Sequence, residues 1–371
     1  MKLIPSMLIL ALVSVISFSC APSIYKEVYP TLADGNYDSE FPYRGCSQQL
    51  EEISESVRRI SVMTSYKCYS FPLKDSVRIA DITPHALQLA ERGVTFQHQS
   101  NAGTATTIYN QDGRIALLTC AHVVDFPDTL TSYYLGENRQ PTVYVRSFAL
   151  RMSQLIFLNE VAGGVALEIL ALDRASDIVF LGQKLDLRQT LGVRVFTYPF
   201  GKAKELEWGT FVYLFGYPSG YRMVTKGIVS SPNKDAKGSF IVDAVVSPGA
   251  SGSIALAIRD GVPNFELVGL VKLIPAQVSY LLAPWTKGGE IQYEPQELYQ
   301  GEIYVERKTD IQYGIVQIIP SETVLAVIQR NLRHLAEKGY DLRFLLEPKQ
   351  TEWAVHQLAG NALMKNRATG N

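Results

Sequence analysis

The chain has 371 residues, of which 47% are hydrophobic and 19% are charged. Such a composition can bury a large core, which excludes an intrinsically disordered protein and a coiled coil. Its 35 Lys and Arg residues nearly equal its 36 Asp and Glu residues, so it lacks the cationic excess that neutralises phosphates, and we expect no nucleic-acid partner. At about 150 residues per domain, the length predicts roughly two folding units.

Residues 1–19 have the pattern of an export signal. Lys2 precedes an unbroken apolar run, Met7–Ile16, which is too short to cross a bilayer and has the length of a signal-peptide core. The stretch Ser17–Cys20 resembles a bacterial lipobox, which predicts cleavage before Cys20 and lipid on that residue. The mature protein would then be a membrane-anchored lipoprotein of the cell envelope, facing the periplasm or exterior. The alternative is an ordinary secretory signal in which Cys20 is incidental; both interpretations export the protein.

Residues 20–55 are predicted to be a tether and extension. The stretch 21–45 is polar, rich in turn formers and without a period, and residues 48–55 have the composition of a short acidic helix. Export permits a disulfide between Cys46 and Cys68, one of three pairings open to Cys46, Cys68 and Cys120. The absence of a Cys-x-x-Cys motif excludes zinc ribbons and thioredoxin-type redox sites.

From Val57 onward, short apolar runs are separated by Gly, Asn and Asp. The clearest hairpin joins Thr104–Tyr109 to Arg114–Thr119 through the turn Asn110–Gly113, because Asp-Gly between apolar runs favours a tight reversal. Short strands at this spacing, with few helical stretches between them, predict an all-β sandwich or barrel system. The further predicted strands are Thr142–Phe148, Ala166–Leu172, Ile178–Leu181, Val193–Tyr198, Thr210–Phe215, Met223–Val229, Phe240–Val246, Ser253–Ile258, Leu267–Leu273 and Gly314–Ile319.

One helix is clear near the C-terminus. Ser321 caps it, Gly339 ends it, and apolar residues recur on one face at Val324, Ile328, Leu332 and Leu335. The segment before the first hairpin is longer than a connection requires, so we expect an inserted loop or helix at Pro84–Arg92. The tail, 341–371, has one further amphipathic turn around Trp353–Leu363 and no assignable role.

Three residues in separate stretches suit nucleophilic catalysis. His122 ends an apolar strand, Asp177 lies at the mouth of another, and Ser251 lies between glycines. Taken singly, each has a structural interpretation: a core histidine, a turn-forming aspartate and a tight turn. Together they supply what a serine nucleophile needs, because a base must take its proton and a carboxylate must fix the tautomer of that base.

These stretches, in this order, resemble the trypsin/chymotrypsin superfamily of serine endopeptidases, in the style of bacterial heat-shock-type trypsin-like proteases. The similarity runs from about Val57 to Gly339. It implies a double six-stranded antiparallel β-barrel, with barrels at 56–190 and 191–340 and a C-terminal helix closing the second. The matching stretches are Thr119–His122, Ser176–Val179, Gly216–Gly220, Gly227–Ser230, Asp243–Ser253 and Val268–Val271.

The resemblance implies that protein or peptide substrates are cleaved through an acyl-enzyme. His122 would be the general base and then the general acid, Asp177 would orient it, and Ser251 would attack the scissile carbonyl. The N–H groups of Gly249 and Ser251 would form the oxyanion hole. In the superfamily's register, Val245 and the strand around Gly269 would line the S1 pocket and bind substrate. Neither carries a negative charge, which predicts a small or medium apolar P1 residue.

The sequence departs from the family pattern in several places. Cys120 stands where Ala is usual, and its size allows it to pack there. Ser253-Ile254 replaces the usual Gly-Pro after the nucleophile. Ala250 replaces the acid that pairs with a freshly cut N-terminus in digestive members, so zymogen activation is not expected. After Gly339 too few residues remain for a PDZ module, so none is expected.

Two other functions match parts of the sequence. An α/β-hydrolase elbow, Gly-x-Ser-x-Gly, nearly fits, but Ser253 breaks it, and that fold requires a His after the Ser and alternating helices. The alternative from another class is a catalytically inactive trypsin-like binding or scaffold lipoprotein, although all three residue types of the triad are present. The five His residues are scattered and no phosphate-loop motif occurs, so we expect no metal and no cofactor.

Overall fold

The computed structural model describes residues 34–347 except 41, 43–44, 90–92, 138–139, 159–163, 274–275, 285–295, 297, 299–300 and 312–313. The predicted signal at 1–19, the lipidation site Cys20 and the predicted turn at Trp353–Leu363 lie outside the described residues. Among the helices of the described part, none combines the length and the hydropathy needed to cross a bilayer.

The N-terminal half of the chain forms a closed antiparallel barrel. Its strands follow the order β1-β2-β3-β7-β6-β5, and pairing of β1 with β5 closes the ring, while β4 adds to the outer side of β5. The predicted hairpin is β2–β3, and Gln111 pairs with Arg114, so its turn is Asp112-Gly113, both with positive φ. The strands are β1 (Val57–Ser70), β2 (Thr95–Gln111), β3 (Arg114–Thr119), β4 (Thr129–Leu135), β5 (Pro141–Leu158), β6 (Val165–Asp173) and β7 (Ile178–Lys184).

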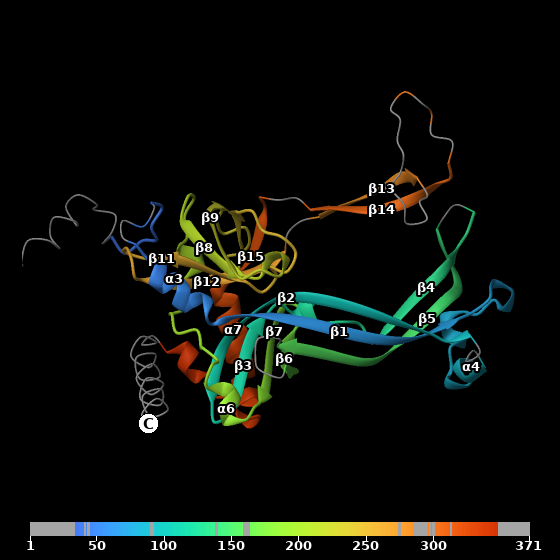
Figure 1. The fold of residues 1–371 in the computed structure, drawn as a ribbon, viewed down its shortest axis with the longest axis horizontal. Helices are drawn as coiled ribbons and strands as arrows, with labels where there is room; N and C mark the ends of the chain where they lie inside the picture. The colour runs from blue at the N-terminus through green and yellow to red at the C-terminus, as the bar shows by residue number, and fades with distance from the viewer. Residues whose placement is uncertain are drawn as a thin grey trace, which may run out of the picture.

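The C-terminal half forms a second closed antiparallel barrel with the strand order β10-β15-β12-β11-β8-β9. Helix α7 (Ser321–Glu337) follows β15 and packs against β12 and β15 of this barrel and β6 of the first (Figure 1). The strands are β8 (Phe211–Gly216), β9 (Met223–Ser231), β10 (Phe240–Asp243), β11 (Ile254–Ile258), β12 (Phe265–Leu273) and β15 (Val316–Pro320). The prediction of two six-stranded antiparallel barrels with a C-terminal helix is confirmed.

Two arms extend beyond the barrels. Figure 1 shows the far ends of β1, β2 and β5 projecting together with β4, and the hairpin of β13 (Ala276–Pro284) and β14 (Ile303–Ile311) projecting toward the same side. Small clusters of buried side chains, separate from the main core, stabilise the first arm. The remaining helices are α3 (Ser47–Ser54), α4 (Pro84–Leu89), α5 (Ala121–Val124) and α6 (Leu187–Thr190).

Most of the predicted helices and strands are observed, and one predicted strand is not. The helix expected within Pro84–Arg92 is α4, and each of the other predicted strands except one overlaps an observed strand. The exception, Val193–Tyr198, is wrong: the segment is irregular, and Val193 and Phe196 are apolar because they are buried in the core rather than because they belong to a ladder. Strand β4 and the β13–β14 hairpin were not predicted.

The Cys46–Cys68 disulfide is absent, and both thiols are free and buried. Cys46 precedes α3 and its Sγ lies 3.8 Å from the hydroxyl oxygen of Tyr213 in the second barrel. Cys68 lies near the far end of β1, eleven residues beyond Val57, which corresponds to roughly 36 Å at about 3.3 Å per residue. A pairing that export permits is therefore prevented by the length of the strand between the two cysteines.

Candidate active site

His122 is presented by a single helical turn that follows the barrel strand β3. Strand β3 ends at Thr119, and in the turn α5 the neighbours Ala121, Val123 and Val124 are buried in the core. The His122 side chain is 40% exposed, because the burial of its neighbours turns it outward. The buried apolar residues therefore fix the direction of the imidazole ring.

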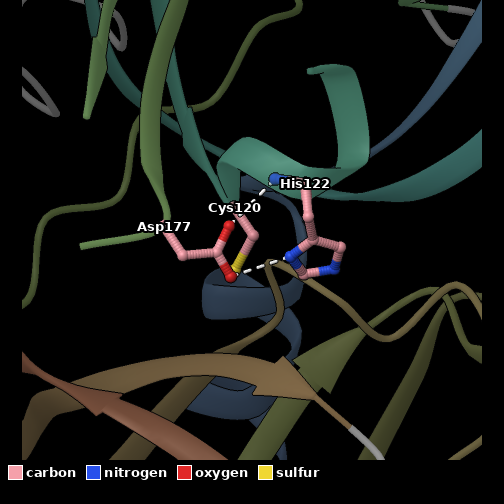
Figure 2. A group of neighbouring side chains, drawn as sticks. All are labelled: Cys120, His122 and Asp177. Atoms are coloured by element: carbon pink, nitrogen blue, oxygen red, sulfur yellow. Dashed lines mark hydrogen bonds and ion pairs between the residues drawn. The ribbon is translucent and has the colours of Figure 1, made fainter. Parts of the chain in front are cut away.

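Asp177 holds this turn and the ring together. Its Oδ1 accepts the backbone N–H of His122 at 2.9 Å, and its Oδ2 lies 2.8 Å from His122 Nδ1. The residue has a left-handed backbone, with φ of 57°, which Asp tolerates better than most side chains. Figure 2 shows the second ring nitrogen pointing away from Asp177. Since a carboxylate accepts hydrogen bonds, this arrangement favours the proton on Nδ1 and leaves Nε2 as an acceptor.

Ser251 lies on the irregular segment between β10 and β11, which is fixed against β2 of the first barrel. The carbonyl of Ser251 accepts the N–H of Thr104 at 2.9 Å, and Thr104 Oγ1 donates to the carbonyl of Gly249 at 2.8 Å. Gly252 has φ of 84°, and a Cβ there would clash with the carbonyl of Thr104 and the hydroxyl of Thr119. The segment requires glycine at this position because it approaches the first barrel so closely.

Two contacts show that Ser251 lies beside the His122–Asp177 pair. A Cβ on Gly103 would lie 2.6 Å from Val123 Cγ1 and 3.2 Å from the Ser251 carbonyl oxygen, so the neighbour of His122 and Ser251 flank the same glycine. The carbonyl of Val271 accepts both the thiol of Cys120, at 3.2 Å, and the N–H of Gly252, at 2.8 Å. The structure thus places the segment that carries Ser251 next to the turn that carries His122.

The amides of the Ser251 segment differ in their partners. Ala250 N–H donates to the carbonyl of Ser247, and Ser253 N–H donates to that of Ala250. Within the described residues, the N–H groups of Gly249 and Ser251 have no acceptor. These are the two amides that the sequence predicts for an oxyanion hole, and both remain free to donate.

The Ser251 hydroxyl donates to the carbonyl of Lys272 at 3.5 Å, and in the described part of the chain no hydrogen bond joins it to His122. Hydrogen bonds between catalytic groups are often long or absent without substrate and shorten when it binds. Rotation about χ1 of Ser251 is the motion that changes the partner of this hydroxyl.

Cys120, His122 and Asp177 are close enough to be considered as metal ligands, because one ligand atom from each lies within 4.8 Å of the others. Metal binding needs a thiolate. Burial, reinforced by the charge of Asp177, raises the pKa of the Cys120 thiol well above its usual range, and the thiol donates to the carbonyl of Val271. A neutral thiol engaged in this way does not fit a metal site, and Cys120 is the small packing residue that the sequence predicts.

The two predicted substrate-binding residues lie in different surroundings. Val245 is 71% exposed between the buried residues Ala244 and Val246. Gly269 pairs inside the second barrel, where a Cβ would clash with the carbonyl of Ile319, so barrel packing requires glycine at this position. The residue of β12 that reaches Ser251 is Lys272. It lies at an irregularity in the pairing of β12 with β15, which no pattern in the sequence reveals.

A groove borders the site along β2. One pocket of about 450 Å³ reaches Gly249, a second of about 360 Å³ reaches His122, and Ser100 and Asn101 line both. Gly249 and His122 thus line two hollows that meet at Ser100 and Asn101 of β2. Concave surfaces of this size with a few polar groups are typical of ligand sites.

Comparison with known proteins agrees with this geometry. Residues 103–270 match the family model of the trypsin-like peptidase domain, a span that contains His122, Asp177 and Ser251. No curated protein matches the chain. The chain therefore carries a trypsin-like peptidase domain, with the double-barrel fold of the trypsin/chymotrypsin-like superfamily.

Proposed function

We propose that the protein is a serine endopeptidase that hydrolyses peptide bonds through an acyl-enzyme. The observation that carries the proposal is the environment of His122. Its Nδ1 is held by Asp177, and its Nε2 has no partner within the described residues. The segment with Ser251 and the two amides that lack an acceptor in the described chain is bound to β2 next to the turn that carries this imidazole. A histidine that served only packing would not need that arrangement.

In the proposed reaction, His122 Nε2 takes the proton of Ser251 as Oγ attacks the scissile carbonyl carbon. The N–H groups of Gly249 and Ser251 donate to the oxyanion that forms, and Asp177 stabilises the imidazolium. The C–N bond then breaks, and His122 gives the proton to the leaving amine. A water molecule, deprotonated by the same imidazole, releases the acyl group and restores Ser251.

An active-site probe tests this proposal. We expect a fluorophosphonate to label the full chain and not the Ser251→Ala variant, because the probe reacts with a serine whose hydroxyl is activated by a base. Labelling is measured by in-gel fluorescence, with heat-denatured protein as the blank. A folded wild-type protein that takes no label would instead favour the inactive binding or scaffold protein.

We also propose that P1 is small or medium and apolar. The support is Val245, which is uncharged and exposed on the segment that carries Ser251. Its replacement by Asp is expected to shift P1 preference toward Lys and Arg in a peptide-library cleavage profile, and an unchanged profile would remove Val245 from the S1 pocket.

Export and anchoring extend the proposal. The apolar run Met7–Ile16 and the following Cys20 support a lipoprotein that acts on substrates at the cell envelope. We expect cells that express the chain to incorporate labelled palmitate into the wild type and not into Cys20→Ala. Equal labelling of both proteins, or of neither, would contradict an anchor on Cys20.

A further inference from the structure

A third pocket, separate from the two that border β2, is lined by three lysines. It has a volume of about 330 Å³ and lies between the turn before β7, the loop between β9 and β10, the end of β12, and β15 with the start of α7. Its cations are Lys234 and Lys237 from the loop and Lys272 from β12. It shares no lining residue with the groove along β2.

The three lysines are not neutralised by the acids near them. Within the described residues, none of their side chains forms an ion pair or a hydrogen bond. Asp235, which also lines the pocket, accepts backbone N–H groups of Lys237 and Ser239 in its own loop.

The acids nearest the rim of the pocket are also engaged. Asp173 accepts the N–H of Ser176 and pairs with Arg330. Glu322, at the start of α7, accepts the N–H of Lys204 and the hydroxyl of Ser321. With three lysines and the single carboxylate of Asp235 in its lining, the pocket presents an excess of positive charge.

Two residues that line the pocket adjoin the proposed catalytic residues. Ser176, on one wall, immediately precedes Asp177, and Lys272, on another, has the carbonyl that accepts the Ser251 hydroxyl at 3.5 Å. Extended peptide advances about 3.3 Å per residue, so a substrate whose scissile bond lies at Ser251 has residues within reach of this pocket. A cationic pocket in this position fits a carboxylate on the substrate.

We propose that the lysine pocket, lined by Lys234, Lys237 and Lys272, binds an acidic side chain of the substrate a few residues from the scissile bond. This proposal rests on the proposed peptidase function and names the class of peptide that the site prefers. Three ammonium groups against the one carboxylate of Asp235 leave a net positive charge, which favours Asp or Glu over the neutral amides of the same shape. Because the lysines are exposed, the preference is expected to weaken as salt screens the charges.

Matched peptides test the proposal by cleavage. Internally quenched decapeptides that the full-length protein cleaves are synthesised in pairs, with Glu or Gln at one position in turn. At the position whose side chain enters the pocket, we expect kcat/KM to be roughly 5- to 20-fold higher for the Glu peptide than for the Gln peptide at low ionic strength. This Glu-to-Gln ratio should fall in high salt. The variant Lys234→Gln/Lys237→Gln is expected to bring the ratio toward one. In the control Lys74→Gln, which alters an exposed lysine on the first arm, the ratio is unchanged.

A binding measurement separates this proposal from the peptidase function. Fluorescence anisotropy of a fluorescein-labelled Glu-rich decapeptide and its Gln-rich counterpart is measured with the Ser251→Ala variant. Tighter binding of the Glu-rich peptide that Lys234→Gln/Lys237→Gln abolishes would support the pocket, even if the wild type cleaves nothing and takes no fluorophosphonate. Equal binding of both peptides, or a Glu preference that survives the double variant, would overturn the pocket whether or not the protein is a peptidase.

Discussion

Replacement of Ser251 by alanine is expected to lower kcat/KM for peptide hydrolysis by about 10⁴- to 10⁶-fold, because the variant has no nucleophile to form the acyl-enzyme. The segment should remain folded, since its contacts with the first barrel use the carbonyls of Gly249 and Ser251 rather than the hydroxyl. The hydroxyl's one hydrogen bond in the described chain, to Lys272, is long. The loss is measured with a quenched peptide, and circular dichroism checks the fold.

The control is Ser230→Ala on β9, whose hydroxyl donates to the carbonyl of Ile228 in its own strand, and its activity should match the wild type. His122→Ala should lose a similar factor. The double variant Ser251→Ala/His122→Ala should be no slower than Ser251→Ala, because groups that act as one unit do not lose activity additively. Losses that multiply in the double variant would show that His122 and Ser251 act independently.

Asp177→Asn is expected to reduce kcat/KM by roughly 10⁴-fold while the protein stays folded. Asn tolerates the left-handed backbone at this position, where φ is 57°, nearly as well as Asp. An amide has only one oxygen, however, and Asp177 uses one oxygen for the His122 backbone N–H and the other for Nδ1. With its NH₂ group facing the ring, Asn favours the opposite tautomer, in which Nε2 carries the proton and cannot act as the base.

The matched control for this variant is Asp186→Asn, because Asp186 precedes α6 and Asn serves equally well before a helix. Both variants should unfold within a few degrees of the wild type, which is measured by thermal denaturation. Wild-type activity in a well-folded Asp177→Asn protein would remove the carboxylate from the mechanism.

The hydrogen bond of Ser251 bears on the choice between an enzyme and an inactive scaffold. The hydroxyl donates to Lys272, while His122 is already held by Asp177 and the amides of Gly249 and Ser251 have no acceptor in the described chain. A serine side chain changes rotamer easily, but a displaced His or Asp would require movement of the backbone. The orientation of His122 by Asp177, which would cost the most free energy to create, is therefore already present without substrate.

The sequence alone determined the features that depend on neighbouring residues. Asp112-Gly113 produces a tight hairpin because both residues adopt positive φ, and the apolar stripe after Ser321 produces α7 because its period matches a helix. The family was also predicted from the sequence, because the stretches around His122, Asp177 and Ser251 follow one another in the order that resembles a trypsin-like peptidase.

The tertiary structure decided what depends on distant residues. It separated Cys46 from Cys68 along β1, and it made Val193–Tyr198 a buried connector although its apolar pattern suggests a strand. It also placed the carbonyl of Lys272 beside the Ser251 hydroxyl, at an irregularity in strand pairing. The physical reason is the same in each case: strand register and burial are set by pairings between segments far apart in the chain, and a local pattern contains no information about which partner a segment meets.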